Sequence, residues 1–314
     1  MKIVVWQTAY LGDLVLTTPL VRSLLKAFPE AEITLVARPF AEELLKGYPV
    51  RVVPFSKTFK ENLRLLKELR GYELAVSPHR SARAALTLFL ARVKRRVGFN
   101  RSELPFLYTD LVEHRWGVHE VERNLALLKP LGVKEPVREP KLFVEEEETL
   151  RVREKFNLSG PYAVVAPFSN FPLKEWSLKN WEEFIRALSR RVTVVVTGTE
   201  SDRKRAEALK APFVNAVGRT SLRELAALIR GAKLVAANDS APVHLANALG
   251  VKAFTVYTAT SPYYGFYPLK GGYLENPAPC SPCSPNPKRC KAGRPVCKEL
   301  PRPEDFLNLV ERAL

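Results

Sequence analysis

The chain alternates short apolar runs with longer segments of helical periodicity, and this alternation constrains the fold more than any other feature. In the N-terminal half we predict strands at residues 2–6, 32–37, 51–54 and 73–77, and helices at 13–28, 40–46, 58–70, 81–91 and 118–131. Strands that alternate with helices indicate a parallel sheet joined by right-handed crossovers. The N-terminal half is therefore expected to be an α/β domain.

The same alternation restarts after a charged segment at residues 141–160, which we interpret as the linker region. Its run of four Glu residues, 145–148, is also compatible with a solvated helix start. Beyond it we predict strands at 162–166, 192–197, 233–237 and 253–257, and helices at 177–188, 201–209, 222–229, 241–249 and 303–313. The predicted domains are residues 1–155 and 156–314. Two such halves predict an interdomain crevice at the carboxyl ends of their strands, where open α/β sheets bind ligands.

The net charge of the chain limits the kinds of molecule that it is expected to bind. The chain of 314 residues carries 49 Lys and Arg against 33 Asp and Glu, a net charge of +16. Such an excess indicates an acidic partner, which is nucleic acid, an anionic membrane surface or a phosphorylated substrate. Many charged residues beside a single Gln and a single Met are typical of a thermophilic protein.

No targeting or membrane segment is apparent. The N-terminus runs directly into a predicted strand, without the charged and apolar regions of a signal peptide. The most apolar later stretch, residues 84–91, is far shorter than the roughly 20 residues that cross a bilayer. We expect a soluble cytoplasmic protein whose membrane contact is peripheral and electrostatic.

Two loops that follow predicted strands contain candidate catalytic and phosphate-binding residues. In the first, at residues 7–13, Gly12 permits close backbone approach, and Asp13 fits either a helix N-cap or a general base. In the second, at residues 166–176, Ser169 and Lys174 lie before a helix. Lys174 suits a phosphate ligand, although an exposed loop lysine is often only solvated.

Two further loops follow strands of the second half. Glu200 fits either a contact to ribose hydroxyls or a helix cap. Asp239 and Ser240 begin a predicted helix whose free N–H groups favour a phosphate. His244 lies one turn further on, on the face of the helix that can meet the same anion. The other interpretation of His244 is a histidine buried in the core.

A basic stretch at residues 78–102 contains seven Lys or Arg and no acidic residue. In it, Arg80 and Arg83 are three residues apart and are expected to share a helix face. Arginine suits bidentate recognition of carboxylate and phosphate, so this stretch fits either an acidic acceptor or a solvated basic surface.

The four cysteines all lie late in the chain, at Cys280, Cys283, Cys290 and Cys297, within an expected loop at residues 277–298. Their C-x2-C-x6-C-x6-C spacing allows a structural zinc site, disulfides, or packing of free thiols. We assign them no catalytic role.

Taken in order, these motifs resemble glycosyltransferase family 9, the ADP-heptose:lipopolysaccharide heptosyltransferases. The resemblance rests on Leu11-Gly12-Asp13, the loop that contains Lys174 and Trp176, and the D-S-x-x-x-H-L-A segment from Asp239 to Ala246. The late C-x-P-C cluster is similar to the heptosyltransferase II branch. The family has a GT-B fold of two Rossmann-like domains facing a cleft, and it transfers heptose with inversion from ADP-heptose to the lipopolysaccharide inner core.

The resemblance also implies roles for individual residues. Asp13 matches the catalytic base, and Lys174 matches the lysine at the donor phosphate. The other implied donor-binding residues are Ser169, Glu200, Thr220, Asp239, Ser240, Ala241 and His244, and the implied acceptor-binding residues are Gly12, Arg80 and Arg83. The family often has Pro-Gly where this chain has Pro167-Phe168, and often Gly where Ala241 stands.

By the same resemblance, the partners are ADP-heptose, the lipid A–core acceptor and the anionic inner membrane surface. No tightly bound cofactor is expected, and Mg²⁺ is compatible but not required, because Lys174, His244 and the helix start can neutralise the diphosphate. Other functions remain open from the residues: another GT-B transferase or an epimerase, and a basic nucleic-acid-binding protein. The sequence contains no recognisable nucleic-acid-binding motif, so nucleic acid is not expected as a partner.

Overall fold

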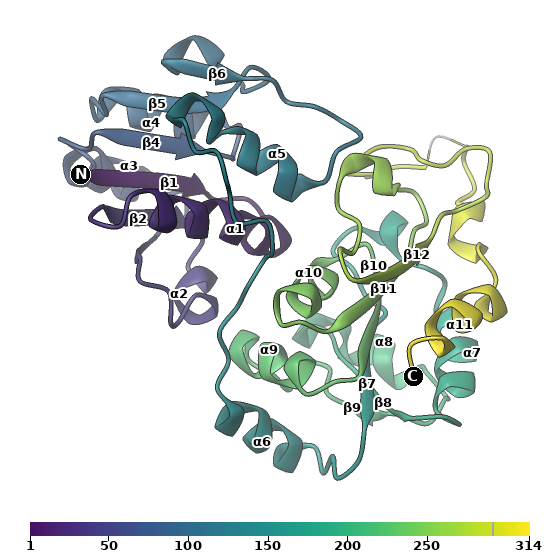
Figure 1. The fold of residues 1–314 in the computed structure, drawn as a ribbon. Helices are drawn as coiled ribbons and strands as arrows, with labels where there is room; N and C mark the ends of the chain where they lie inside the picture. Colours follow the sequence, from purple (N-terminus) through teal and green to yellow (C-terminus); the bar gives the residue numbers. More distant parts are fainter. Residues whose placement is uncertain (291) are drawn as a thin grey trace. The chain divides into compact units, whose positions relative to one another are not determined.

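The computed structural model describes residues 1–290 and 292–314, which form two compact units (Figure 1). The first unit is residues 1–143 and the second is residues 144–314. The sequence placed the boundary at 155/156. The segment between the two positions contains helix α6 (Glu146–Lys155), which contacts α9 (Leu222–Arg230) of the second unit.

The first unit is built on a parallel sheet with the order β3-β2-β1-β4-β5-β6. Its strands are β1 (Lys2–Gln7), β2 (Glu32–Ala37), β3 (Arg51–Pro54), β4 (Leu74–Ser77), β5 (Arg95–Phe99) and β6 (Asp110–Val112). Its helical elements are α1 (Leu11–Ala27), α2 (Phe40–Leu44), α3 (Phe59–Glu68), α4 (Ala82–Leu90), η1 (Pro105–Leu107), α5 (Glu120–Ala126) and η2 (Lys129–Leu131).

Helices cover both faces of this sheet. Val4 and Trp6 of β1 pack in one core cluster with Leu65 of α3 and Leu88 of α4. Successive strand residues alternate in direction, so the buried Ile3 points to the opposite face. Right-handed crossovers on the two sides of β1 place α1 on that opposite face, where it contacts α5.

The second unit repeats the plan, with the sheet order β12-β11-β10-β7-β8-β9. Its strands are β7 (Tyr162–Ala166), β8 (Thr193–Val196), β9 (Val214–Asn215), β10 (Leu234–Asn238), β11 (Lys252–Val256) and β12 (Gly271–Leu274). Besides α6 and α9, its helical elements are η3 (Pro172–Lys174), α7 (Leu178–Leu188), η4 (Glu200–Asp202), α8 (Arg203–Glu207), α10 (Ala241–Ala248), η5 (Pro262–Tyr264), η6 (Val296–Glu299) and α11 (Pro303–Glu311).

An aromatic cluster anchors α7 and α11 to one face of the second sheet. Helix α7 begins where the Ser177 side chain accepts a hydrogen bond from the backbone N–H of Asn180. Trp181 and Phe184 follow at helical spacing and are fully buried. Trp181 makes edge-on ring contacts with Trp176 and with Phe306 of α11. The C-terminal helix therefore completes the core of the second unit.

Numbered within its own unit, each sheet has the strand order 3-2-1-4-5-6, the order of the Rossmann fold. Chain direction across the sheet reverses between β1 and β4 in the first unit and between β7 and β10 in the second. Ligands of doubly wound sheets bind at this switch point, beyond the carboxyl ends of the strands. The topology therefore predicts a ligand site in each unit at the switch point, beyond the carboxyl ends of the strands.

The structure corrects several predicted elements. The segment interpreted as a linker contains α6. The other interpretation of its Glu run, a helix start, is confirmed: Glu148 accepts a hydrogen bond from the Glu145 N–H in a capping box. The helix expected at 118–131 is the shorter α5 followed by η2. Strands β5, β6, β9 and β12 were not predicted. They lie at or next to the sheet edges. Strands β6 and β9 have only three and two residues, too few for a clear periodic signal, and β5 and β12 begin with two Arg and two Gly, which do not indicate a buried strand.

Within the described residues, no helix combines the length and the apolar character needed to cross a membrane.

We expect Trp181→Ala to destabilise the second unit by about 3–5 kcal/mol, because it removes a buried indole and its ring contacts. The matched control is Leu150→Ala on the exposed side of α6, which should change stability by less than about 0.5 kcal/mol. Urea unfolding followed by circular dichroism measures both. Equal stability of the two variants would contradict the anchoring role of the aromatic cluster.

Candidate functional site

The loop between β7 and α7 crosses the switch point of the second sheet and brings a lysine to the start of α10. The Lys174 Nζ lies 2.9 Å from the Asp239 Oδ2, and both side chains are largely buried. Asp239 follows the last residue of β10, and Ser240 is the N-cap of α10. The two residues that the sequence assigned to separate loops therefore meet in one ion pair.

The position of Lys174 depends on the residue before it. The Leu173 carbonyl accepts hydrogen bonds from the Thr258 Oγ1 at 2.6 Å and from the Ala259 N–H at 3.3 Å. The Leu173 side chain packs in a small cluster with the four cysteines and Ala259. Lys174 is therefore held by the segment after β11 as well as by Asp239.

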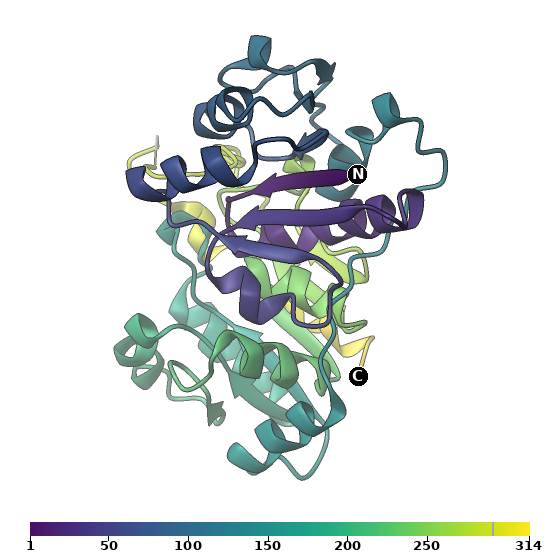
Figure 2. The same ribbon diagram turned by 90° about the vertical axis from the view of Figure 1, so that its left-hand side faces the viewer.

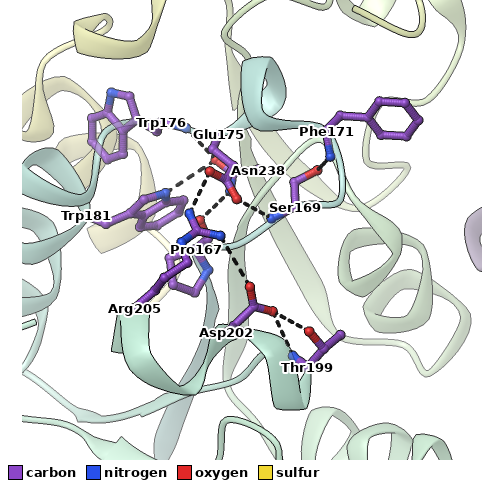
Figure 3. A network of polar contacts seen from close by, with 10 residues as sticks. All are labelled: Pro167, Ser169, Phe171, Glu175, Trp176, Trp181, Thr199, Asp202, Arg205 and Asn238. Carbon is purple, nitrogen blue, oxygen red and sulfur yellow. Dashed lines mark hydrogen bonds and ion pairs between the residues drawn. The ribbon is translucent and has the colours of Figure 1, made fainter. Parts of the chain in front are cut away.

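A buried amide fixes both ends of the same loop (Figure 3). Asn238, at the end of β10, has no exposed surface. Its Nδ2 donates to the Pro167 carbonyl at 2.8 Å, and its Oδ1 accepts from the Trp176 N–H at 3.0 Å and from the Trp181 Nε1 at 3.3 Å. Residues 167 and 176 are thus bonded to one side chain, and the loop between them contains Ser169 and Lys174.

Glu175 adds a second restraint, which Figure 3 shows beside Asn238. Its Oε1 accepts the Ser169 N–H at 2.9 Å, and its Oε2 accepts from the Arg205 Nη2 at 2.6 Å. Arg205 also pairs with Asp202, whose carboxylate accepts the N–H and the hydroxyl of Thr199. This network joins the loop after β7 to the loop after β8.

The other predicted donor residues lie on the same sheet edge, with different exposure. Ser169 is half-buried, and its Oγ accepts the Phe171 N–H at 3.2 Å. Glu200 is mostly exposed and pairs with Arg203 at 2.9 Å. Thr220 is half-buried and immediately precedes Ser221, the N-cap of α9. Ala241 is the first residue of α10.

His244 is buried within α10, one turn after Ser240, and its ring makes an edge contact with Phe266 at 6.1 Å. The position agrees with both interpretations of this residue, the core histidine and the helix-start group.

In the first unit, Asp13 serves as a capping residue at the carboxyl end of β1. It is the third residue of α1, and its Oδ2 accepts the Tyr10 N–H at 3.1 Å. Gly12 is buried beside it. Asp13 is half-buried, and its charge acts on two groups of the same unit, Glu120 and Arg80. The structure therefore bears out the helix-capping interpretation of Asp13.

A buried ion pair lies at the same edge of the first sheet. Glu120 pairs with Arg123, whose guanidinium also donates to the carbonyls of Arg115 and Val118 and lies over the ring of Trp116. Burial raises the pKa of Glu120 to about 7, Arg123 opposes this rise, and the charge of Asp13 adds to it. Sequence reasoning did not select this pair, although His119-Glu120-x-x-Arg123 has the i, i+3 spacing of a helical ion pair.

The two predicted acceptor arginines do not share a helix face, so that prediction is wrong. Helix α4 begins at Ala82 with Ser81 as its N-cap, and Arg80 therefore lies in the loop before it. Arg80 is half-buried, and burial is the main cause that lowers its pKa. Arg83 lies on the exposed side of α4 and donates to the Lys57 carbonyl. Only Arg80 is at the sheet edge that carries Asp13.

The four cysteines form no disulfide in the structure. Cys297 is buried, and burial followed by the other three thiols raises its pKa to about 11. Within residues 1–290 and 292–314, no three His, Cys, Asp or Glu side chains are arranged to hold a metal ion. The four side chains pack in one cluster with Leu173, Ala259 and Ala278.

Lowering the pH is expected to destabilise the first unit through His114. Burial, then Arg80, Arg123 and Arg101, lower the pKa of His114 to about 4, whereas an unfolded histidine titrates near 6.5. The folded state thus binds fewer protons, so the stability present above pH 6.5 is lost as the pH falls toward 4, by at most about 1.4 kcal/mol per pH unit.

His114→Phe should flatten this dependence, since Phe keeps the ring contacts with Phe99 and Trp116 but cannot bind a proton. Urea unfolding of both proteins across the same pH range measures the two slopes. Parallel slopes would show that His114 is protonated in the folded state as readily as in the unfolded chain.

A family model and the sequences of known proteins indicate the same family for this chain. The model of glycosyltransferase family 9 (heptosyltransferase) matches residues 62–291. Lipopolysaccharide heptosyltransferase 3 of Escherichia coli is 29% identical over 276 residues, which are 79% of this chain and 81% of that protein. Lipopolysaccharide heptosyltransferase 2 of Salmonella typhimurium is 28% identical over 294 residues, which are 83% and 84% of the two chains.

Solved structures agree at the level of the fold. The ADP-heptose lipopolysaccharide heptosyltransferase II of E. coli superposes with a TM-score of 0.82 at 24% identity, covering 100% of this chain and 98% of that one. A family 9 glycosyltransferase from Veillonella parvula gives 0.83 at 19% identity, covering 99% and 96%. The predicted fold class, two Rossmann-like α/β domains of the GT-B type, is confirmed.

Proposed function

Because the chain belongs to glycosyltransferase family 9, the heptosyltransferases, we propose that it transfers a heptose from ADP-heptose to the inner core of lipopolysaccharide. The relatives named above support the acceptor class, since their names specify lipopolysaccharide. A heptosyltransferase of E. coli solved with ADP supports the donor class. We further propose an activity of the heptosyltransferase II type, which the sequence resemblance favours.

The observation that carries this proposal is the ion pair of Lys174 with Asp239 at the switch point of the second unit. A largely buried ammonium at the start of a helix is suited to a diphosphate, because both the cation and the free N–H groups of the helix attract it. We assign donor binding to this edge, with Ser169, Glu200, Thr220, Ser240, Ala241 and His244 as further donor-binding residues.

The proposed reaction is an inverting displacement. The acceptor hydroxyl oxygen forms a bond to the anomeric carbon while the bond from that carbon to the diphosphate oxygen breaks. The Asp13 carboxylate takes the hydroxyl proton, and the electron pair of the broken bond leaves with ADP. Positive charge develops on the sugar ring and negative charge on the diphosphate. Lys174 and the start of α10 stabilise that negative charge.

We assign acceptor binding to the first unit. Gly12 is buried beside Asp13, and Arg80 supplies a half-buried guanidinium at the same sheet edge. An acceptor that carries phosphates and carboxylates fits such a group because arginine binds both in a bidentate manner. Arg83 lies further out on α4, where it meets only the periphery of a large acceptor.

Asp13→Asn separates the two roles of this residue, because the amide oxygen can still accept the Tyr10 N–H. We expect initial rates of heptose transfer to fall by about 10²- to 10⁴-fold. The affinity for ADP, measured by calorimetry, and the melting temperature should stay close to those of the parent. A variant that transfers heptose at the parental rate would remove Asp13 from the proposed mechanism.

Lys174→Ala is expected to weaken ADP binding by about 10- to 100-fold, the effect of losing one hydrogen bond between charged groups. It also leaves the Asp239 carboxylate without its cation, so the double variant Lys174→Ala/Asp239→Asn is needed to isolate the effect of the ammonium. Lys179→Ala, an exposed lysine on α7, is the matched control. ADP affinity that is unchanged in both Lys174 variants would place the donor elsewhere.

A further inference from the structure

One side of the first unit exposes a set of large apolar side chains, which we call the α3–α4 face. It consists of Phe59, Leu63, Leu86, Phe89, Leu90 and Phe106. Phe59 and Phe106 are 79% and 75% exposed. Water-exposed apolar patches on a soluble domain are unfavourable and usually mark a binding surface.

The six side chains come from neighbouring elements. Helices α3 and α4 are in contact, and their ribbons lie near each other in Figure 2. Asn62 and Thr87 join them through a hydrogen bond of 3.4 Å. Arg83 of α4 also donates to the Lys57 carbonyl, just before α3. At the far side, α4 contacts η1, which carries Phe106. The apolar surface therefore extends from α3 across α4 to η1.

Helical spacing explains why these residues are exposed. Leu65 of α3 and Leu88 of α4 point into the core beneath the helices. Phe59 and Leu63 are four residues apart, as are Leu86 and Leu90, so each pair projects from one side of its helix. Each helix is therefore apolar on its buried side and partly apolar on its exposed side.

Basic residues outnumber acidic ones in the segment that carries the apolar surface. Residues 57–106 contain twelve Lys or Arg and four acidic residues. The acidic side chains are all engaged locally: Glu61 and Glu103 accept backbone N–H groups at the starts of α3 and α4, Glu68 pairs with Arg51, and Glu73 accepts the Lys2 N–H. Lys60, Lys67, Arg92 and Lys94 are exposed on the two helices or just after α4. This region therefore carries a strong local excess of positive charge.

The positive charges of this region act on individual side chains. Burial, then the charges of Arg38 and Arg83, lower the pKa of Lys57, which precedes α3. Arg96 lies 5.6 Å from the centre of the Phe89 ring, so a cation is already stacked at the border of the apolar surface. Cations and apolar rings thus occur side by side on this face.

We propose that the α3–α4 face binds the surface of an anionic lipid bilayer. The apolar side chains enter the boundary between headgroups and acyl chains, and the surrounding Lys and Arg contact the lipid phosphates. Charge complementarity favours this partner over a second copy of the chain, because a symmetric contact would bring the same positive surface against itself. The proposal concerns binding to membranes and not catalysis, so it is tested separately from the proposed transfer.

The first experiment is co-sedimentation with vesicles of phosphatidylglycerol and phosphatidylethanolamine, and with vesicles of phosphatidylcholine alone. We expect the protein to bind the anionic vesicles and to be released by high salt. Phe59→Ser/Phe106→Ser and Lys60→Glu/Arg92→Glu should each lower the affinity for anionic vesicles by about tenfold or more. Equal binding to neutral vesicles would overturn the electrostatic part of the proposal.

The matched controls lie in the second unit. Leu150→Ser/Tyr263→Ser removes two exposed apolar side chains, and Lys179→Glu/Lys252→Glu reverses two exposed charges. Both controls should bind anionic vesicles like the parent. If they lose as much affinity as the α3–α4 variants, binding is non-specific and the proposal fails.

A second measurement does not depend on loss of function. Phe59→Trp and Phe106→Trp place an indole on the face, and each should show a blue shift of its fluorescence when anionic vesicles are added. Leu150→Trp should show none. Absence of a shift at both positions contradicts insertion. A dimer in light scattering that Phe59→Ser/Phe106→Ser dissociates would instead make this face an interface between two copies.

Discussion

From the end of β10, the amide of Asn238 satisfies two polar groups of the loop after β7 and one side chain of α7. Because the side chain has no contact with water, each of its bonds would be costly to lose, and the loop after β7 can take only the path that keeps them. Lys174 lies within that loop and reaches Asp239, the residue that follows Asn238. The pairing of these two charges is thus a consequence of how the loop is held.

Each unit also contains a buried carboxylate paired with an arginine near the carboxyl edge of its sheet. Glu175 pairs with Arg205 in the second unit, and Glu120 pairs with Arg123 in the first. Burying such pairs brings little net stability, since desolvation offsets most of the attraction. Their contribution lies in geometry: Glu175 binds the Ser169 backbone with its other oxygen, and Arg123 binds two backbone carbonyls. In both units, charge orders a loop beside the candidate site.

The net charge of +16 is unevenly distributed along the chain. Much of the excess lies at residues 57–101, the segment that also contains the two adjacent helices with exposed Phe and Leu side chains. A basic surface without apolar side chains would suit many anions, whereas this combination suits a lipid surface. Arg80 belongs to the same stretch but lies in the loop after β4, at the sheet edge. One basic segment thus supplies two different surfaces.

The sequence by itself determined the fold class and the loops that carry the candidate site. Strand and helix periodicity is a local property, and the loops with Asp13, Lys174 and Asp239 could be identified from it because they follow strongly apolar strands. Short strands such as β6 and β9 carry too few residues for such a pattern, and their pairing supplies the stabilisation that local preference does not.

Only the tertiary structure decided which side chains hold the loops in place. Asn238 and Glu175 stand in the sequence beside Asp239 and Lys174, but nothing local indicates that they bond to Trp181 and Arg205. It also decided that Arg80 lies outside α4 and that the four cysteines come together in one cluster with Leu173. The physical reason is that these outcomes depend on burial and on partners distant along the chain, and both are defined only when the sheets have formed.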